Sequence, residues 1–264
     1  MSREREFAER AARLAGEEVL RRYRVSGQSS VAVKGLPRDL VTEADHASEA
    51  ILLDLIRREF PGDAIVAEES APGERRAGRV WIVDPLDGTV NFAHGVPLFS
   101  VSVGFAVDGV PEAGCVHAPV LGETYSAAQG EGASLGGAPI RVSGEADLAR
   151  ALLCTGFAYR RNQVAENNLD NFARMELAAR GVRRLGSAAL DLAFVACGRF
   201  DGFWELWLSP WDTCAGIVLV REAGGLVSGI GDGEDPLFGG SIVAANPAIH
   251  AVLAGPEGVR GLRR

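Results

Sequence analysis

The segment Trp81–Phe92, WIVDPLDGTVNF, drives an apolar run directly into two aspartates, Asp84 and Asp87. The run is typical of a buried strand. Pro85 and Gly88 then favour a tight turn, because proline fixes its own φ and glycine permits close approach of the backbone. An ordinary turn does not need two negative charges held close together. The segment therefore predicts either a solvated acidic turn or a site for a cation at the end of a buried strand.

The composition is typical of a globular chain, and its net negative charge disfavours the binding of anions. The 264 residues are 47% hydrophobic and 23% charged, enough for one large domain or two modest ones. The net charge of −8 should repel nucleic acid and anionic lipid on average. An anionic substrate would therefore need bound cations that reverse the local field.

Cysteine usage and the N-terminus favour a cytoplasmic protein. Cys115, Cys154, Cys197 and Cys214 lie far apart and form no CxxC pair, which is typical of free thiols in a reducing compartment. Residues 3–23 have helical spacing and many charges, without the apolar core of a signal peptide. No apolar run reaches the roughly 18 residues of a membrane span.

The hydrophobic pattern predicts an α/β chain. Helices are expected over 3–23, 162–180, 187–198 and 209–225, and residues 39–63 are expected to form a turn that leads into a further helix ending before Pro61. Strands are expected over 30–35, 64–70, 81–84, 98–107, 110–120, 122–129, 149–157, 200–206, 226–229 and 240–246. We expect one domain, residues 1–264, in which an antiparallel first subdomain (about 1–144) packs against a mixed α/β second subdomain (about 145–264).

Acids in two further segments accompany the aspartate pair. Glu68 and Glu69 end the strand expected over 64–70. Asp212 is the third residue of a helix that Ser209 would cap and Pro210 would open. Strand ends and helix N-termini are where open α/β folds place ligand sites. Carboxylates gathered there need a cation, and Mg²⁺ takes carboxylate oxygens while leaving positions for water and phosphate.

Each acid taken alone also has an ordinary explanation. Asp84 and Asp87 fit an exposed turn. Glu68 fits a solvated strand end, and Asp212 would complement a helix dipole. Asp45 fits the acidic first turn of a helix. Only the conjunction of these acids favours a metal site.

Four segments resemble the inositol monophosphatase family, within the Mg²⁺-dependent, lithium-sensitive phosphatases. They read KGLPRDLVTEAD, AIVAEES, WIVDPLDGTVNFAHGVP and PWDTCAGIVLVREAGG, and their order and spacing match over residues 7–250. The resemblance implies an αβαβα five-layer sandwich of the sugar-phosphatase type. It also implies a phosphatase that hydrolyses a small phosphate monoester with a metal-activated water.

The resemblance implies a set of metal ligands. They are Glu68, Asp84, the backbone carbonyl of Leu86, Asp87 and Asp212. It implies two or three Mg²⁺ ions per site, with Mn²⁺ as a substitute and Ca²⁺ or Li⁺ as inhibitors.

Catalytic roles follow from the same resemblance. Asp45 matches an acid that orients water at the outermost metal, and Thr89 and Glu68 match the pair that positions and activates the attacking water. Gly88 and Thr89 match the amides that receive the phosphate, as a helix N-terminus does for anions. Lys34 matches a lysine on a mobile first loop, and it fits a solvated surface lysine equally well.

The substrate contacts point to inositol phosphate. Glu205, seven residues before Asp212, matches the acid that hydrogen-bonds inositol hydroxyls, although it also fits a structural salt bridge. The segment TGFAYRRNQ lacks the serine that animal relatives place near the substrate. The implied contacts are Asp87, Gly88, Thr89, Ala188, Glu205 and Asp212.

Other functions stay open on the sequence. Fructose 1,6-bisphosphate, histidinol phosphate, 3′-phosphoadenosine 5′-phosphate and a broad range of sugar phosphates are substrates elsewhere in the superfamily. Some bacterial relatives act with the transcription machinery, for which Arg160, Arg161, Arg183 and Arg184 offer a contact face or only solvated charge. The resemblance also implies a homodimer. The lack of a membrane span and the net charge of −8 predict no membrane partner and no direct nucleic-acid partner.

Overall fold

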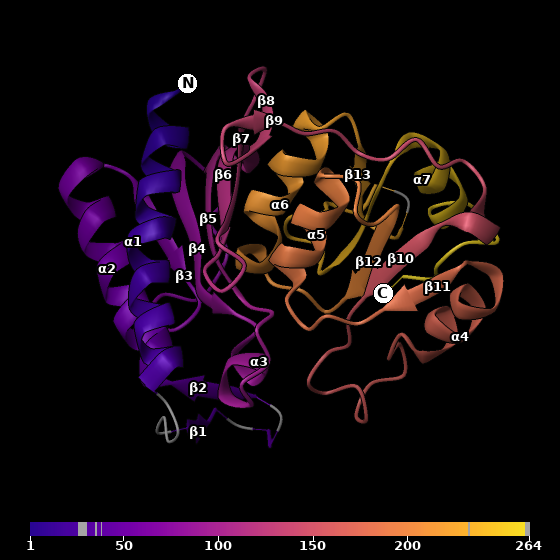
Figure 1. The fold of residues 1–264 in the computed structure, drawn as a ribbon, viewed down its shortest axis with the longest axis horizontal. Coiled ribbons are helices and arrows are strands. Elements are labelled where there is room, and N and C mark those ends of the chain that lie inside the picture. The colour runs from indigo at the N-terminus through magenta and orange to yellow at the C-terminus, as the bar shows by residue number, and fades with distance from the viewer. Residues whose placement is uncertain (26–30, 35, 38, 232, 262–264) are drawn as a thin grey trace.

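The computed structural model describes residues 1–25, 31–34, 36–37, 39–231 and 233–261. The helices are α1 Arg3–Val25, α2 Glu43–Glu59, α3 Thr89–Ala93, α4 Leu169–Ala178, α5 Ala188–Ala196, α6 Pro210–Glu222 and α7 Pro247–Leu253, with a 3₁₀ turn at Leu148–Arg150. Figure 1 shows α1 and α2 as one outer layer and α4 and α7 as the other, with α5 and α6 between two sheets. The chain is thus the αβαβα sandwich that the resemblance implied.

The first sheet has seven strands in sequence order. They are β3 Ala64–Ala67, β4 Arg79–Asp87, β5 Ser100–Val107, β6 Val110–Ala118, β7 Glu123–Ala128, β8 Gly132–Leu135 and β9 Ala138–Pro139. All neighbours are antiparallel except β3 and β4, which are parallel with Ala67 beside Val83. This parallel pair departs from the antiparallel prediction, and it brings Glu68 to the same sheet edge as Asp84.

The second sheet is mixed, in the order β11-β10-β12-β14-β13. Its strands are β10 Leu152–Thr155, β11 Gly181–Arg183, β12 Gly202–Leu206, β13 Leu226–Ser228 and β14 Ser241–Ala245. β10 is parallel to β11 and β12, whereas β14 is antiparallel to β12 and β13. A small hairpin, β1 Val31–Val33 with β2 Leu40–Thr42, lies beside α3 at one end of the layers (Figure 1).

Both faces of the sheets are covered, which explains why their strands read as continuous apolar runs. On β4, Trp81 packs under α1 against Phe7, with ring centroids 4.7 Å apart, whereas its neighbour Ile82 belongs to the core around α5 and α6. On β12, Phe203 faces α5 and α6, and Trp204 faces α4 and α7. The core around α5 and α6 takes side chains from both sheets, so it joins the two halves of the chain.

Glycines bring α6 unusually close to the first sheet. A Cβ on Gly104 of β5 would lie 2.5 Å from the Sγ of Cys214, and one on Gly114 of β6 would lie 2.6 Å from the Cα of Ala215. Only glycine admits this approach. The contact matters for function because it sets the position of the N-terminal turn of α6, which carries Asp212.

Several predicted elements are shorter in the structure. The helix predicted over 162–180 begins only at Leu169, because Asn168 is left-handed with φ 71° and its amide donates to Thr155 and Gly156. The strand predicted over 149–157 contracts to β10. Ser30 and Gly35, the ends of the strand predicted over 30–35, lie outside the described residues. Within the described residues, no helix combines the length and the apolar composition needed to cross a membrane.

The close approach of α6 can be tested by adding one methyl group. Gly114→Ala should lower the free energy of unfolding by about 1–3 kcal/mol, because the new Cβ would overlap the backbone of α6. The matched control is Gly62→Ala, where a Cβ meets nothing within 4 Å and the change should stay below about 1 kcal/mol. Denaturant titration measures both. Equal effects in the two variants would contradict the packing described here.

Candidate active site

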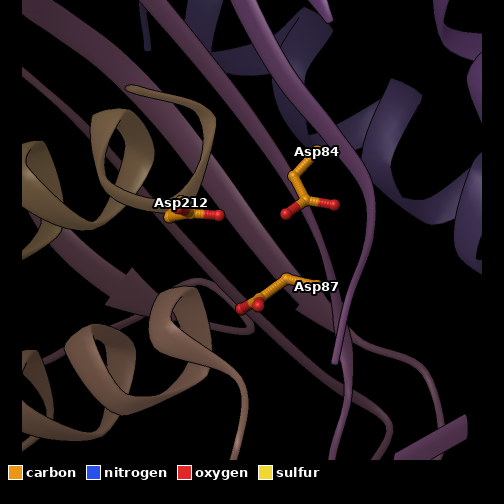
Figure 2. A group of neighbouring side chains, drawn as sticks. All are labelled: Asp84, Asp87 and Asp212. Carbon is orange, nitrogen blue, oxygen red and sulfur yellow. The ribbon is translucent and has the colours of Figure 1, made fainter. Parts of the chain in front are cut away.

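Three aspartates converge where β4 ends and α6 begins. Asp84 and Asp87 come from the end of β4, and Asp212 is the third residue of α6. One carboxylate oxygen from each lies within 4.8 Å of the others. Figure 2 shows the three carboxylates turned toward a common space. The helix start is as predicted, with Ser209 as the N-cap and Pro210 at N1.

Backbone amides orient two of these side chains. The amide of Leu86 donates to Oδ1 of Asp84 at 2.9 Å, within the turn itself. The amide of Ser209 donates to Oδ2 of Asp212 at 2.7 Å, which closes a capping box at the start of α6. Each of these two carboxylates thus has one oxygen held by the local backbone.

Asp87 is held by a different helix. Its Oδ2 accepts from the hydroxyl of Ser187 at 2.6 Å and from the amide of Ala189 at 2.7 Å, at the first turn of α5. A helix N-terminus favours negative charge. The starts of α5 and α6 therefore both face the end of β4, and each stabilises one carboxylate of the cluster.

The cluster concentrates negative charge. Burial, followed by repulsion from Glu68 and Asp87, raises the pKa of Asp84 well above its ordinary value. Burial, followed by repulsion from Asp87, does the same to the pKa of Asp212. Burial raises the pKa of Asp87 to about 6 against the hydrogen bonds from α5. Among the described residues, no ion pair engages these three aspartates, so a divalent cation would relieve the repulsion.

Glu68 joins the site together with a lysine. It follows β3 and lines the same cavity as the aspartates. The Nζ of Lys34 lies 2.8 Å from Oε1 of Glu68 and also contacts Glu69. Burial lowers the pKa of Lys34, but Glu68 and Glu69 together raise that pKa by more, so the net shift is upward. Lys34 is therefore an exposed lysine that pairs with Glu68 and Glu69 at the edge of the cluster.

Thr89 contacts Asp45 and the turn at Leu86. Its hydroxyl lies 2.9 Å from Oδ1 of Asp45 and 3.0 Å from the carbonyl oxygen of Leu86. The other oxygen of Asp45 accepts from both the amide and the hydroxyl of Thr42, at the start of α2. The shared role of Thr89 and Glu68 around an attacking water stays a prediction; in the structure the hydroxyl of Thr89 contacts Asp45, which is buried beside it.

Gly88 shapes the turn that carries Thr89. Its φ is 101°, in the left-handed region, and an added Cβ would lie 3.1 Å from the carbonyl oxygen of Leu98. This position therefore requires glycine. Gly88 and Thr89 line a cavity of about 300 Å³ together with the acidic cluster and the Leu86 turn.

A second cavity of about 320 Å³ adjoins the first. Five residues line both cavities: Asp39, Asp87, Tyr159, Trp207 and Asp212. The predicted substrate residues Ala188 and Glu205 line the second cavity. Burial, followed by repulsion from Asp87, raises the pKa of Glu205 to about 8.

The sequence missed several residues of the second cavity. Trp207 has φ 67°, rare for a non-glycine residue, and the guanidinium of Arg160 lies 4.2 Å above its ring. Tyr159 lines the cavity within the segment that lacks the expected serine. Asp191 also lines the cavity. The sequence could have indicated this residue, because it is the only acid in the apolar segment SAALDLAFVACG.

Comparisons with known proteins show which family this chain is similar to. The sequence model of the inositol monophosphatase family matches residues 1–256. An inositol-1-monophosphatase of Synechocystis is 46% identical over 250 residues, which cover 94% of this chain and 86% of that protein. The Nus factor SuhB of Escherichia coli K12 is 42% identical over 250 residues, 94% of this chain and 93% of that protein.

A solved structure shares the fold as well. The inositol monophosphatase from Anabaena (Nostoc) superposes with a TM-score of 0.83 at 42% identity. The match covers 95% of this chain and 93% of that one. At this identity the likeness extends beyond the fold to the sequence of the whole chain.

The repulsion within the cluster predicts how stability responds to a metal. Asp84→Asn should raise the thermal midpoint of the metal-free protein, by an amount equivalent to about 1 kcal/mol or more, because one buried charge is removed. The same variant should lose most of the stabilisation that Mg²⁺ gives the parent, because binding to the folded state is what raises the midpoint. Thermal denaturation with a chelator and then with Mg²⁺ measures both effects.

The control for this prediction is an exposed aspartate. Asp54 on α2 is exposed and pairs with Arg58 at the surface, so Asp54→Asn should leave both midpoints close to those of the parent. If Asp84→Asn instead destabilised the metal-free protein and kept the full Mg²⁺ increment, the cluster would not be a metal site.

Proposed function

Because this chain belongs to the inositol monophosphatase family and is a phosphatase, we propose that it hydrolyses inositol monophosphate to inositol and phosphate with Mg²⁺. The observation that carries the proposal is the acidic cluster at the junction of two cavities. Asp87 and Asp212 line both cavities, so a metal there would lie between a phosphate on one side and an alcohol on the other.

The residues of the cluster fit a hard divalent cation. All the candidate ligands are oxygens, namely three carboxylates with Glu68 and the Leu86 carbonyl in the same cavity. Such a donor set favours Mg²⁺ or Mn²⁺ over softer metals. When bound, the metal would neutralise charge on the transferring phosphoryl group and activate a water.

The chain's own groups would orient the other reactants. If Thr89 donates its hydrogen to Asp45, a lone pair of Thr89 Oγ1 faces the cavity and can accept a hydrogen bond from the attacking water. Lys34 holds the carboxylate of Glu68 at the same cavity. The amides of Gly88 and Thr89, at the start of α3, are suited to the phosphate oxygens. Positioning of this kind supplies a large part of the rate in phosphoryl transfer.

The second cavity is suited to the alcohol part of the substrate. Its volume of about 320 Å³ is that of a small-molecule pocket. Glu205 and Ala188 lie in it beside Asp87. We therefore place the inositol ring in this cavity, with its hydroxyls toward Glu205.

A sugar bisphosphate is the runner-up substrate, and two arginines favour it. Arg160 and Arg184 line the second cavity. A guanidinium binds phosphate with two hydrogen bonds, so these side chains offer a place for a second phosphate group. Fructose 1,6-bisphosphate and other sugar phosphates thus stay the alternatives to inositol monophosphate.

A role with the transcription machinery is the second candidate. The relatives named Nus factor SuhB suggest it. The arginines offered for such a contact divide in the structure, because Arg160 and Arg184 line the substrate cavity, whereas Arg183 is exposed on β11. A protein contact by Arg160 or Arg184 would therefore involve the active site, whereas one by Arg183 would not need to. The homodimer and the cytoplasmic location stay predictions.

Phosphate release from a substrate panel tests the proposal. With Mg²⁺ present, inositol 1-phosphate should exceed fructose 1,6-bisphosphate, histidinol phosphate and 3′-phosphoadenosine 5′-phosphate in kcat/KM. Asp87→Asn should lower kcat at least about 100-fold, because it weakens the metal site at the junction of the cavities. Asp54→Asn serves as the surface control.

Two results would contradict the proposal in different ways. If inositol 1-phosphate ranks far below another member of the panel, the proposed substrate is wrong, but the chain is still a phosphatase. If Asp87→Asn keeps both the turnover and the Mg²⁺ dependence of the parent, the metal site is wrong.

A further inference from the structure

Asp191 is a buried acid that the chemistry above does not use. It lies on α5, where its neighbours Leu190, Leu192 and Ala193 are fully buried apolar residues, and it is itself only 1% exposed. Within the described part of the chain, its Oδ1 has no hydrogen-bond partner. An unsatisfied buried carboxyl oxygen is costly. If Asp191 served only to fill the core, an apolar side chain at this position would make the folded protein more stable.

The surroundings of Asp191 connect it to the substrate cavity. It lines the second cavity together with Glu205 and Arg184. The thiol of Cys154 interacts with the carboxyl group of Asp191. Burial, followed by repulsion from Glu205 and Asp87, raises the pKa of Asp191 well above its ordinary value. The groups that face Asp191 are thus two acids, one thiol and one arginine.

Glu205 lines the same cavity as Asp191. It lies on β12, is 9% exposed, and packs against Gly156, where an added Cβ would lie 2.1 Å from its Oε2. Glycine at position 156 therefore leaves the room that this carboxyl group occupies. Two buried carboxyl groups in one small cavity cannot both ionise readily, so one of them retains a proton.

A pair of carboxyl groups with one proton is complementary to a hydroxyl group. The protonated member donates to the hydroxyl oxygen, and the hydroxyl donates its own hydrogen to the ionised member. A bound polyol would in this way complete the hydrogen bonding that Asp191 lacks in the described structure. A leaving group that carries no hydroxyl group besides the esterified one would leave Asp191 and Glu205 without hydrogen-bond partners. This difference between substrates would produce the specificity.

We propose that Asp191 and Glu205 form a paired subsite for hydroxyl groups of the leaving alcohol, and that Asp191 is a specificity-determining residue for polyol phosphates. The subsite rests on the proposed function, because it requires a phosphate monoester in the adjoining cavity. It adds to that function a second acid, on a different element from Glu205, that selects the alcohol by its hydroxyl groups.

Kinetics on two substrates test the subsite. Inositol 1-phosphate carries hydroxyl groups on its leaving alcohol, and phenyl phosphate carries none. In Asp191→Ala, the ratio of kcat/KM for inositol 1-phosphate to that for phenyl phosphate should fall roughly 10- to 100-fold, mainly through KM, because a hydrogen bond to a polyol hydroxyl is lost. Asp191→Asn keeps the size and a donor, and should restore part of the ratio.

Controls separate the possible failures. Asp54→Asn should leave the ratio unchanged, and thermal midpoints show whether each variant is folded. If Asp191→Ala does not fold, the same comparison is made with Asp191→Asn, which is expected to lie between the parent and complete loss of preference. An unchanged ratio in a folded variant would overturn the subsite, whether kcat/KM stays the same for both substrates or falls equally for both.

The parent enzyme distinguishes failure of the subsite from failure of the proposed function. A parent that hydrolyses both substrates, with variants that keep its preference, would overturn the subsite alone. A parent that hydrolyses neither substrate in the presence of Mg²⁺ would overturn the proposed function and the subsite with it.

Discussion

Repulsion among the buried carboxylates at the end of β4 is the constraint on which the rest of the structure depends. Asp84, Asp87 and Asp212 place ligand oxygens within 4.8 Å of one another, and no ion pair of the described residues offsets their charge. The fold supports this arrangement by aiming the starts of two helices at it. Ser187 and Ala189 of α5 hold Asp87, and the capping box of α6 holds Asp212. Helix dipoles reduce the repulsion, and a divalent cation would remove most of it.

The layered architecture explains why these helices can reach the site. α5 and α6 lie between the two sheets, in the core that joins both halves of the chain. Gly104 and Gly114 allow α6 to lie against the first sheet, so Asp212 is fixed relative to β4 by backbone contact rather than by flexible side chains. Rigid elements of this kind hold a site to the tolerance that catalysis needs. The same placement opens a second cavity between α5 and β12, where the alcohol would bind.

Much of the site could be predicted from sequence because its signals are local. The aspartate pair with Pro85 and Gly88, and the helix start at Ser209 and Pro210, are each contained within a few residues. The contact between Thr89 and Asp45 could not be found in this way, because it joins segments 44 residues apart and depends on how α2 meets the turn. The parallel pairing of β3 with β4 was missed for the same reason. Asn168 delays the start of the predicted helix to Leu169, because it adopts a left-handed conformation that helical spacing does not reveal.

Anomalous scattering from crystals grown with Mn²⁺ would test the role of the carboxylate cluster most directly. We predict a strong anomalous peak within coordination distance of oxygens from Asp84, Asp87 and Asp212 together. The same map from Asp84→Asn crystals should show a weaker peak or none at that position. A parent map without a peak among the three carboxylates, at Mn²⁺ concentrations that support turnover, would contradict the view that this repulsion exists to be neutralised by a metal.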